Sequence, residues 1–598
     1  MERKKSQLLF NFLPDDTFNH SRNGTIGRIG WIYEDRKSKV SDLPKGYLLR
    51  RIRPYVEQWP NDVPLRPDNV DLVSPDGASF DIFPRVFECR SCGACTEFSE
   101  DDIKSGSSPR CGHCGKEFDD TEQLQFVTVC TCGALDSVPV PYCSCGHSYP
   151  RFRRPTSQMS DSYWECPECG DYIGDAYTAL DNCRFCGDRQ RIKVHSSSTT
   201  FYPQKASFVN VEDQDLNSIA RSDEFQKQKI VDYLLDQDQA TQSDETELDV
   251  DQDVLDALGV TEEEYLDKKE EVNEERQQER EEAMEWVEDT FDDRRRRAVS
   301  EEVFEFESLV KNADIDATSL EQLQEEAKSR KDLDPAVVDQ YKDARNTLNI
   351  DSVRMISDFP ITTVVYGYSR LNPGPNEDSR LNTFHGKNGN DRMFAQTAEE
   401  EAVMFTLDSE SVFKWLQENG IVNEWPDEDL DKWFLRNLRE YPYYEEVDPD
   451  DDSEIARHTL TLLHTMSHTV MSAIDALSGY SKDSLVEYLL PHTLSFVIYK
   501  RSDTDFSLGA MHTLVEDRFL RFVDYINSDA EVCIYDPVCE EEENAACEDC
   551  LFISNISCDN GNHNLSRSTL YGGKFDDGDI EKGYLDIQVA EDGTNVGS

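Results

Sequence analysis

Eighteen cysteines are the residues of this 598-residue sequence most able to do chemistry, and they lie in two clusters. Twelve of those between Cys89 and Cys186 form six short pairs, and glycine follows the second cysteine of every pair. A chain that wraps two thiolates around one tetrahedral ion must turn sharply after the second ligand. Glycine accepts the positive φ that such a turn often needs. The repeated pattern therefore predicts metal-binding knuckles.

Taken in chain order, the six pairs predict three zinc sites of four cysteines each. The predicted ligand sets are Cys89, Cys92, Cys111 and Cys114; Cys130, Cys132, Cys143 and Cys145; and Cys166, Cys169, Cys183 and Cys186. Cys95 is left over. A site closed by four thiolates has no open position for water, so we expect structural metals. Iron–sulfur ligation is the alternative, but the two-plus-two spacing with glycine favours zinc. The Cys-x-Cys pairs leave the pairing in the middle site open.

The second cluster runs from Cys533 to Cys558. Four of its five cysteines, Cys539, Cys547, Cys550 and Cys558, can close a fourth zinc site. No glycine follows its Cys-x2-Cys pair, which indicates a different kind of site. A group of reactive or buried thiols is the alternative, and no role is assigned to Cys533. We therefore expect about four zinc ions per chain.

Two further motifs bear on catalysis. No Gly-Lys dipeptide ends a GxxxxGK spacing followed by Ser or Thr, so the sequence has no phosphate-cradling loop. His464 and His468 stand at i and i+4 and could place two imidazoles on one metal. However, Thr465 occupies the position where an HExxH zinc hydrolase needs glutamate. Buried hydrogen bonds at a helix interface are the favoured interpretation, and we expect no catalytic residues and no enzyme activity.

The charge of the chain is extreme, with 122 Asp and Glu against 61 Lys and Arg. In molar salt the screening length is about 3 Å, which removes most surface self-repulsion, so the balance favours halophilic adaptation. Long acidic disordered tails are the alternative. No apolar run is long enough to span a bilayer and the start lacks a cleavage signal, which predicts a cytoplasmic protein.

The charge is also uneven. Residues 1–205 hold 26 Lys and Arg against 29 Asp and Glu, so the remaining 393 residues hold 35 against 93. A near-neutral third is a candidate contact surface for nucleic acid or a partner, although compact metal-binding segments can simply carry fewer carboxylates. Two basic groups follow the second and third predicted sites and are predicted to bind DNA: Arg151, Arg153 and Arg154, and Arg189, Arg191 and Lys193.

The elements around these residues predict a multidomain α+β chain. We expect a mixed strand and loop domain over 1–88, a zinc-ribbon domain over 89–211, and a solvated acidic helical connector over 212–350. A mixed α/β domain with the fourth zinc site would cover 351–573, and 574–598 would be a disordered acidic tail. Within the C-terminal domain, the patterns predict a strand over 352–372, helices over 397–440, a helix from about 456 to 477 ended by Gly479, a strand at LSFVIYK and a turn near SLGAMHTLV. The arginine run 294–297 could contact phosphate, but its acidic flanks favour internal neutralisation.

Several blocks, in this order, resemble one known family. They are FPRVFECRSCG at 83–93, QFVTVCTCGALDSVPVPYCSCG at 125–146, TTFYPQKASFVNV at 199–211, VVYGYSRLNP at 364–373, LLHTMSH at 462–468, IYK and LGAMHTLVE within 498–516, and CIYDPVC to STLYGG at 533–573. The set resembles the DrmB component of the DISARM phage-defence systems, in a halophilic version. Its C-terminal half resembles the domain of unknown function that this family shares with MrfA-type helicases.

The resemblance implies a non-catalytic subunit of an antiviral defence complex, partnering a DrmA-like DNA helicase and engaging foreign DNA through that complex. It also implies zinc ligation by Cys539, Cys547, Cys550 and Cys558, and core roles for the YGYSR and LHTMSH blocks. Family members often have Gly-His after a cysteine near position 130, where this chain has Gly133-Ala134. Two other hypotheses stay open: a stand-alone zinc-ribbon nucleic-acid-binding factor in transcription or DNA repair, and an unrecognised metallohydrolase.

Overall fold

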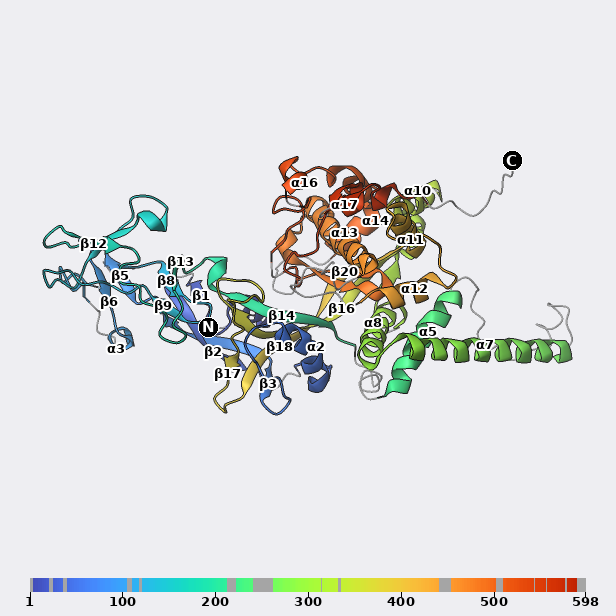
Figure 1. The fold of residues 1–598 in the computed structure, drawn as a ribbon, viewed down its shortest axis with the longest axis horizontal. Coiled ribbons are helices and arrows are strands. Elements are labelled where there is room, and N and C mark those ends of the chain that lie inside the picture. Colours follow the sequence, from blue (N-terminus) through green and yellow to red (C-terminus); the bar gives the residue numbers. More distant parts are fainter. Residues whose placement is uncertain are drawn as a thin grey trace. The chain divides into compact units, whose positions relative to one another are not determined.

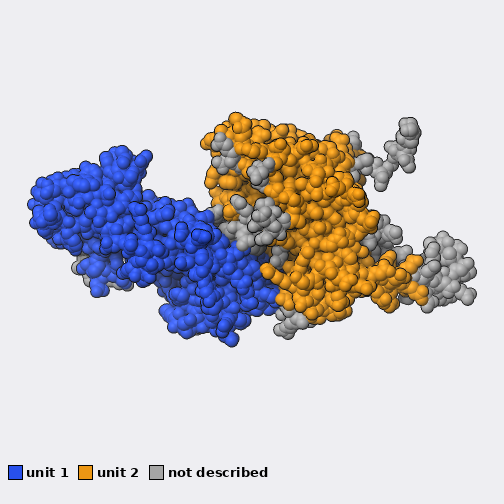
Figure 2. Space-filling view, viewed as in Figure 1, with its two compact units in different colours: residues 1–210, 361–398 blue, residues 211–360, 399–598 orange. Residues whose placement is uncertain are grey.

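The computed structural model describes residues 4–20, 25–35, 40–104, 110–117, 121–211, 222–239, 262–312, 315–331, 335–439, 453–501, 509–542, 544–554, 557–575 and 578–588. It is an α+β structure, as expected, with several separate sheets (Figure 1). The chain forms two compact units, Met1–Asn210 with Ile361–Ala398 and Val211–Pro360 with Glu399–Ser598 (Figure 2). This differs from the five consecutive segments expected, because each unit is built from two separate stretches of chain.

Unit 1 begins with a three-stranded antiparallel sheet and two helices. The sheet has the order β1 (Thr17–Asn19), β2 (Ile26–Glu34) and β4 (Pro75–Ile82), while β3 (Val70–Val73) pairs elsewhere. Ile29 and Ile32 of β2 are fully buried. The helices α1 (Lys5–Asn11) and α2 (Lys45–Glu57) were not expected in this segment, although they account for the burial of Tyr47 and Tyr55 on α2.

Three small antiparallel sheets follow and carry the first cysteine cluster. Their strand orders are β6 (Cys95–Glu97), β5 (Val86–Cys89), β7 (Thr121–Gln123); β13 (Arg191–Val194), β8 (Phe126–Val129), β9 (Leu135–Ser137); and β10 (Arg151–Arg153), β11 (Tyr163–Glu165), β12 (Tyr172–Asp175). Their shared apolar core is small and centres on Phe152 and Trp164, whose rings lie 4.7 Å apart. Cores of this size rarely stabilise a fold without metals or other cross-links.

Two long strands continue from one unit into the other. They are β16 (Ile350–Ser369) and β18 (Asp391–Leu407), and they are neighbours in the largest sheet. Within unit 1, β14 (Tyr202–Val209) pairs antiparallel with β16 from Ser369 to Ile361, and β3 pairs parallel with the start of β18. The strand predicted over 352–372 is therefore confirmed.

The predicted connector belongs to unit 2 and is only partly solvated. It contains α5 (Asp223–Gln239), α7 (Glu262–Thr290), α8 (Asp293–Lys311), β15 (Ala317–Ser319), α9 (Leu320–Lys331) and α10 (Pro335–Thr347). Helix α5 packs against α7 and α8, and α8 is buried over most of its length. Arg295 donates to the carbonyl oxygens of Leu435 and Leu438, and the buried Arg296 pairs with Asp293 at 2.8 Å. Arg295 and Arg296 therefore bind partners within unit 2.

The core of unit 2 is a sheet covered by the long helix α13 (Glu454–Ser478). Strands β19 (Leu485–Leu490) and β20 (Ser495–Lys500) extend the sheet beside β18, and α13 packs on both. The predicted helix and its end are confirmed, since Ser453 caps α13 and Gly479 follows it with a φ of 84°. Helices α11 (Ser409–Glu418), α14 (Ala510–Asp517) and α15 (Phe519–Asp524) contact α13, and α12 (Leu430–Asn437) contacts α11.

Two local expectations in unit 2 were wrong. Residues 397–407 are not helical but form the end of β18, because Ala402 to Thr406 pair with Tyr499 to Ser495 of β20. Strong helix formers in the sequence AEEEA had favoured a helix, and the tertiary pairing overrides that preference. The segment near SLGAMHTLV, expected as a turn, contains helix α14.

The segment after Gly572 is part of the fold rather than a disordered tail. It contains β21 (Gly573–Phe575), β22 (Gly578–Ile580) and the short 3-10 helix η7 (Tyr584–Asp586). Tyr584 is fully buried, and its hydroxyl donates to the carbonyl oxygen of Asn349 at 2.6 Å. Residues 589–598 lie outside the described residues. Among the helices that the structure describes, none is both long and apolar enough to cross a membrane.

Candidate metal centres

The six cysteine pairs of unit 1 share one backbone geometry. In each pair the glycine after the second cysteine has a positive φ, between 70° and 94°. The amide of that glycine donates to the carbonyl oxygen of the first cysteine, as Gly93 does to Cys89 at 2.7 Å and Gly187 to Cys183 at 2.8 Å. The predicted role of glycine in these turns is confirmed, and each turn directs two thiols toward one point.

The first of the predicted ligand sets forms as expected. Cys89, Cys92, Cys111 and Cys114 lie together, with Cys89 at the end of β5. The Sγ atoms of Cys89 and Cys114 are 3.6 Å apart, and those of Cys92 and Cys111 are 3.7 Å apart. A disulfide requires about 2.05 Å, whereas the edges of a tetrahedron with metal–sulfur bonds of about 2.3 Å measure about 3.8 Å. These sulfur atoms are therefore spaced for one ion.

The other two sites of unit 1 are nested, not consecutive, which corrects the pairing expected from chain order. The outer pairs form one group and the inner pairs form another: Cys130, Cys132, Cys183 and Cys186, and Cys143, Cys145, Cys166 and Cys169. Facing sulfur atoms lie 3.4–3.5 Å apart in the outer site and 3.6 Å apart in the inner site.

Strand pairing explains the nesting. Strand β8 leads into Cys130 and β13 follows Cys186, and the two strands pair antiparallel with Val129 opposite Arg191. This pairing brings the first and last knuckles to the same end of one sheet. Strands β10 and β11 pair with Arg151 opposite Glu165, directly before Cys166. That second hairpin brings the two inner knuckles together, so each sheet organises its own site.

The fourth four-cysteine group, in unit 2, consists of Cys533, Cys539, Cys547 and Cys550. Cys533 replaces the expected Cys558, and its Sγ lies 3.6 Å from that of Cys547. Cys539 and Cys550 are 3.7 Å apart. Burial raises the pKa of the Cys539 thiol, so a bound cation is what would favour its thiolate form.

A buried arginine supports this fourth group and was not found from the sequence. Arg567, 5% exposed, places Nη2 2.8 Å from Asp536 Oδ1 and 3.8 Å from Cys539 Sγ. The guanidinium therefore holds the loop that carries Cys533 and Cys539 and faces a ligand sulfur with positive charge. Arginine within a polar stretch such as NLSRS carries no sequence signal for this role.

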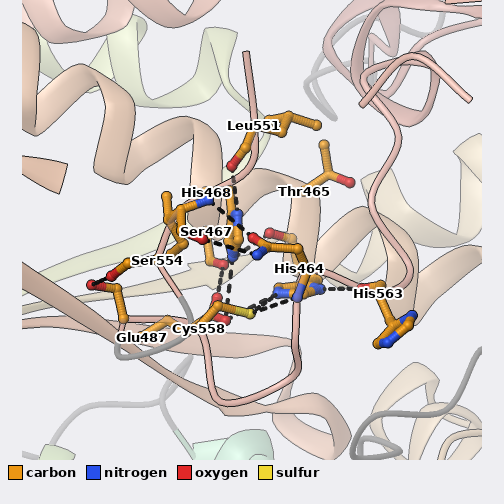
Figure 3. A network of polar contacts seen from close by, with 12 residues as sticks. His464, Thr465, Ser467, His468, Glu487, Leu551, Ser554, Cys558 and His563 are labelled. Atoms are coloured by element: carbon orange, nitrogen blue, oxygen red, sulfur yellow. Dashed lines mark hydrogen bonds and ion pairs between the residues drawn. The ribbon is translucent and has the colours of Figure 1, made fainter. Parts of the chain in front are cut away.

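Cys558 lies instead in a fully buried group with His464, His468 and Glu487 (Figure 3). The amide of Glu487 on β19 contacts the carbonyl oxygen of Ser557, which places Cys558 beside that strand. Both histidines make buried hydrogen bonds, as expected from the sequence. Glu487 was missed, because nothing distinguishes it among 122 acidic residues.

Cys95, the cysteine left over in the first cluster, packs in the apolar core beside Val86 and Leu124. Its side chain is fully buried, and desolvation raises the pKa of its thiol to about 12. A neutral thiol of this kind behaves as a small apolar side chain.

The first basic group predicted to bind DNA is engaged with carboxylates. Arg153 Nε lies 2.7 Å from Glu165 Oε2, and Arg154 Nη2 lies 2.8 Å from Glu88 Oε2. Arg151 donates from Nε to the carbonyl oxygen of Cys92 at 2.7 Å. A phosphate would have to displace these partners, which weakens this group as a DNA-binding surface.

The second basic group is better placed. Arg189 and Arg191 are exposed and Lys193 is half-buried, and Arg191 and Lys193 alternate on β13 with the buried Ile192 between them. Arg191 and Lys193 therefore share one face of the strand. Arg189 and Arg191 line a shallow hollow that also includes Arg380 as well as Glu377 and Asp378.

Comparison with known proteins gives one result for this region. A family model described as a domain of unknown function, DUF8724, matches residues 4–211. The match takes in the three cysteine sites of unit 1 and both basic groups, and ends where the first stretch of that unit ends. No curated protein matches the chain.

Proposed function

We propose that this chain is a non-catalytic, zinc-binding subunit of an antiphage defence complex, which partners a DNA helicase and helps to engage foreign DNA. The observation that carries the proposal is the set of four closed four-cysteine groups. Sites of this kind bind a metal without an open position, so they support a scaffold rather than a reaction centre.

Zinc is the metal that we propose, and the geometry favours a single ion over an iron–sulfur cluster. A centre that lies about 2.3 Å from each of four sulfur atoms has room for one ion, not for a multi-iron cluster with its bridging sulfides. Each site would contribute on the order of 10–16 kcal/mol of apparent binding energy, which is comparable to the stability of a whole domain. The three small sheets of unit 1 have little other core to hold them.

Contact with DNA is proposed for Arg189, Arg191 and Lys193. The outer site fixes both β8 and β13, because Cys130 and Cys186 are ligands next to these strands. Cations on a rigid base lose less conformational freedom when they bind a phosphate, which favours contact. Residues 1–205 are near-neutral, so DNA meets less repulsion there than on the rest of this acidic chain.

The partner is proposed from the ordered resemblance to the DrmB family, whose blocks extend through both units. A helicase partner would supply the ATP-dependent step, and the complex would work in the cytoplasm. A stand-alone nucleic-acid-binding factor is the competing function. Affinity purification of the tagged chain from its native host distinguishes the two: a co-purifying DNA helicase supports the proposal, and recovery of the chain with RNA polymerase or with nucleic acid alone contradicts it.

The DNA surface is tested by exchanging Arg189, Arg191 and Lys193 together for glutamine. Binding of the complex to a labelled duplex is measured across a salt series. Removing one phosphate contact should lower the slope of log affinity against log salt by about 0.9. The matched control replaces Arg151, Arg153 and Arg154 with glutamine and should change the slope less. An unchanged slope in the first variant would assign the DNA surface to the partner.

A further inference from the structure

The group formed by His464, His468, Glu487 and Cys558 has features that ordinary buried hydrogen bonding does not explain. Each residue offers one ligand atom, these four atoms all lie within 4.8 Å of one another, and all four residues are buried. The histidines come from α13, Glu487 from β19, and Cys558 from the segment after the fourth cysteine group (Figure 3).

The hydrogen bonds of the two imidazoles fix which nitrogen carries a proton. His464 Nδ1 lies 2.9 Å from the carbonyl oxygen of His563, and His468 Nδ1 lies 2.8 Å from the carbonyl oxygen of Leu551. A carbonyl oxygen only accepts, so both Nδ1 atoms are donors. In the neutral imidazole the Nε2 atom then carries a lone pair. Histidines that bind metals are commonly oriented in this way, by an N–H donated to a carbonyl.

Both Nε2 atoms point toward the same oxygen. His464 Nε2 is 3.0 Å and His468 Nε2 is 3.3 Å from Glu487 Oε1. Glu487 Oε2 accepts a hydrogen bond from the Ser467 hydroxyl. An ionised carboxylate has only acceptors, so two nitrogen lone pairs would face an oxygen lone pair in a fully buried site. With both imidazoles neutral, this arrangement is unfavourable unless a cation lies between the three atoms.

Cys558 provides the fourth ligand atom of the group. Its Sγ lies 3.4 Å from His464 Nε2 and accepts from the amide of Asn562 at 3.3 Å. A tetrahedral ion with bonds of about 2.0–2.3 Å to nitrogen, oxygen and sulfur gives edges of about 3.3–3.6 Å. The separations from His468 Nε2 to Glu487 and from His464 Nε2 to Cys558 fall within that range, and the separation from His464 Nε2 to Glu487 is slightly shorter.

We propose that these four residues form a further zinc site, with His464 Nε2, His468 Nε2, a Glu487 carboxylate oxygen and the Cys558 thiolate as ligands. The charges support it, because two neutral imidazoles, one carboxylate and one thiolate together balance a divalent cation. Binding releases the thiol proton to solvent and changes no oxidation state. With four protein ligands the site is closed, so the ion is structural. The ion joins α13, β19 and the segment that carries Cys558, all within unit 2. It raises the proposed zinc content of the chain from four to five.

The first test uses the wild-type full chain and needs no variant. Native mass spectrometry should give five zinc ions per chain. X-ray absorption at the zinc edge should require nitrogen or oxygen ligands, namely three of the twenty ligands in five four-coordinate sites. Four zinc ions with an all-sulfur ligand shell would overturn the proposal.

The second test compares two buried cysteines. Cys558→Ser combined with His468→Gln removes two ligands and should lower the zinc content from five to four, with the loss of the nitrogen and oxygen contribution. Cys95→Ser exchanges an equally buried thiol in an apolar core and should leave five ions. If the double variant does not fold, the wild-type spectrum decides. A folded double variant that keeps the wild-type zinc content would contradict the assignment.

Discussion

Arg370 Nε donates a hydrogen bond of 2.9 Å to the carbonyl oxygen of Gly133, the glycine of the first knuckle in the outer metal site. The same guanidinium donates to the carbonyl oxygens of Thr200 and Asp15, and the side chain is 1% exposed. One residue from the YGYSR block therefore joins three segments of unit 1. Asn382 lies against Gly133 as well, so a Cβ at that position would clash with its side chain.

Replacing Arg370 with lysine should destabilise unit 1 by about 3–5 kcal/mol, because a single ammonium cannot reach three carbonyl oxygens and a buried charge loses partners. Thermal unfolding and the rate of zinc release to a chelator measure the effect. Arg380→Lys, at an exposed position of the same unit, is the control. Equal melting temperatures for the two variants would contradict a supporting role for Arg370.

The nested pairing predicts which thiols share a metal. Cys145→Ser should weaken the inner site, so Cys143, Cys166 and Cys169 should become reactive toward an alkylating reagent. Cys130 and Cys132 should stay protected, because their ion is shared with Cys183 and Cys186. Mass spectrometry of the alkylated peptides identifies the reactive residues. If Cys130 and Cys132 react while Cys166 and Cys169 stay protected, the sites are paired in chain order and the nested pairing is wrong.

The carboxyl group of Asp16 predicts that the stability of unit 1 depends on pH. Desolvation raises the pKa of this half-buried carboxyl to about 7, against the lowering effects of the Thr17 amide and Arg370. The native state then keeps a proton that the unfolded state loses near pH 3.8, so stability should fall as pH rises from about 4 to 7.

Asp16→Asn keeps the acceptor for the Thr17 amide. Because the variant cannot titrate at this position, its loss of stability with rising pH should be smaller than that of the wild type by about 1–3 kcal/mol. Denaturant unfolding at pH 5 and pH 8 tests this, with the exposed Asp62→Asn as control. The same decrease in Asp16→Asn and in the wild type would show that Asp16 does not titrate in this range.

The net charge of −61 predicts a requirement for salt. Lowering the salt from molar concentration to about 0.1 M lengthens the screening distance from about 3 Å to about 10 Å, so the carboxylates repel one another more strongly. The melting temperature should drop. A melting temperature independent of salt would remove the argument for halophilic adaptation.

The segment from Gly573 to Gln588 predicts that two truncated chains will differ in stability. Ending the chain after Gly572 should leave unit 2 less stable than ending it after Gln588, because only the shorter chain lacks the buried Tyr584 and Ile587. Tyr584→Ala alone should cost about 3–5 kcal/mol, and Tyr584→Phe about 1 kcal/mol for the hydroxyl that bonds Asn349. Urea unfolding measures each value. Equal stability of the two truncated chains would contradict the packing described.

The sequence predicted the local turns but not the partners of each ligand. Glycine after each pair is a local requirement, so the knuckles could be located from residues such as Gly93 and Gly187. The pairing depends on β8 meeting β13, which is separated from it by more than sixty residues and carries no local signal. Cys558 was assigned to its nearest cysteines because its contact with His464 is visible only in the folded chain.

The nested sites also impose an order on assembly. The inner site closes spans of 21 and 26 residues, while the outer site closes spans of 51 and 56 residues around it. Closing the longer loop from a free chain costs about 0.8 kcal/mol more entropy than closing the shorter one. Once the inner hairpin has captured its ion, however, the outer loop is effectively shortened to the segments on either side of that hairpin. Metal uptake should therefore proceed from the inside outward, so that each captured ion prepares the geometry for the next.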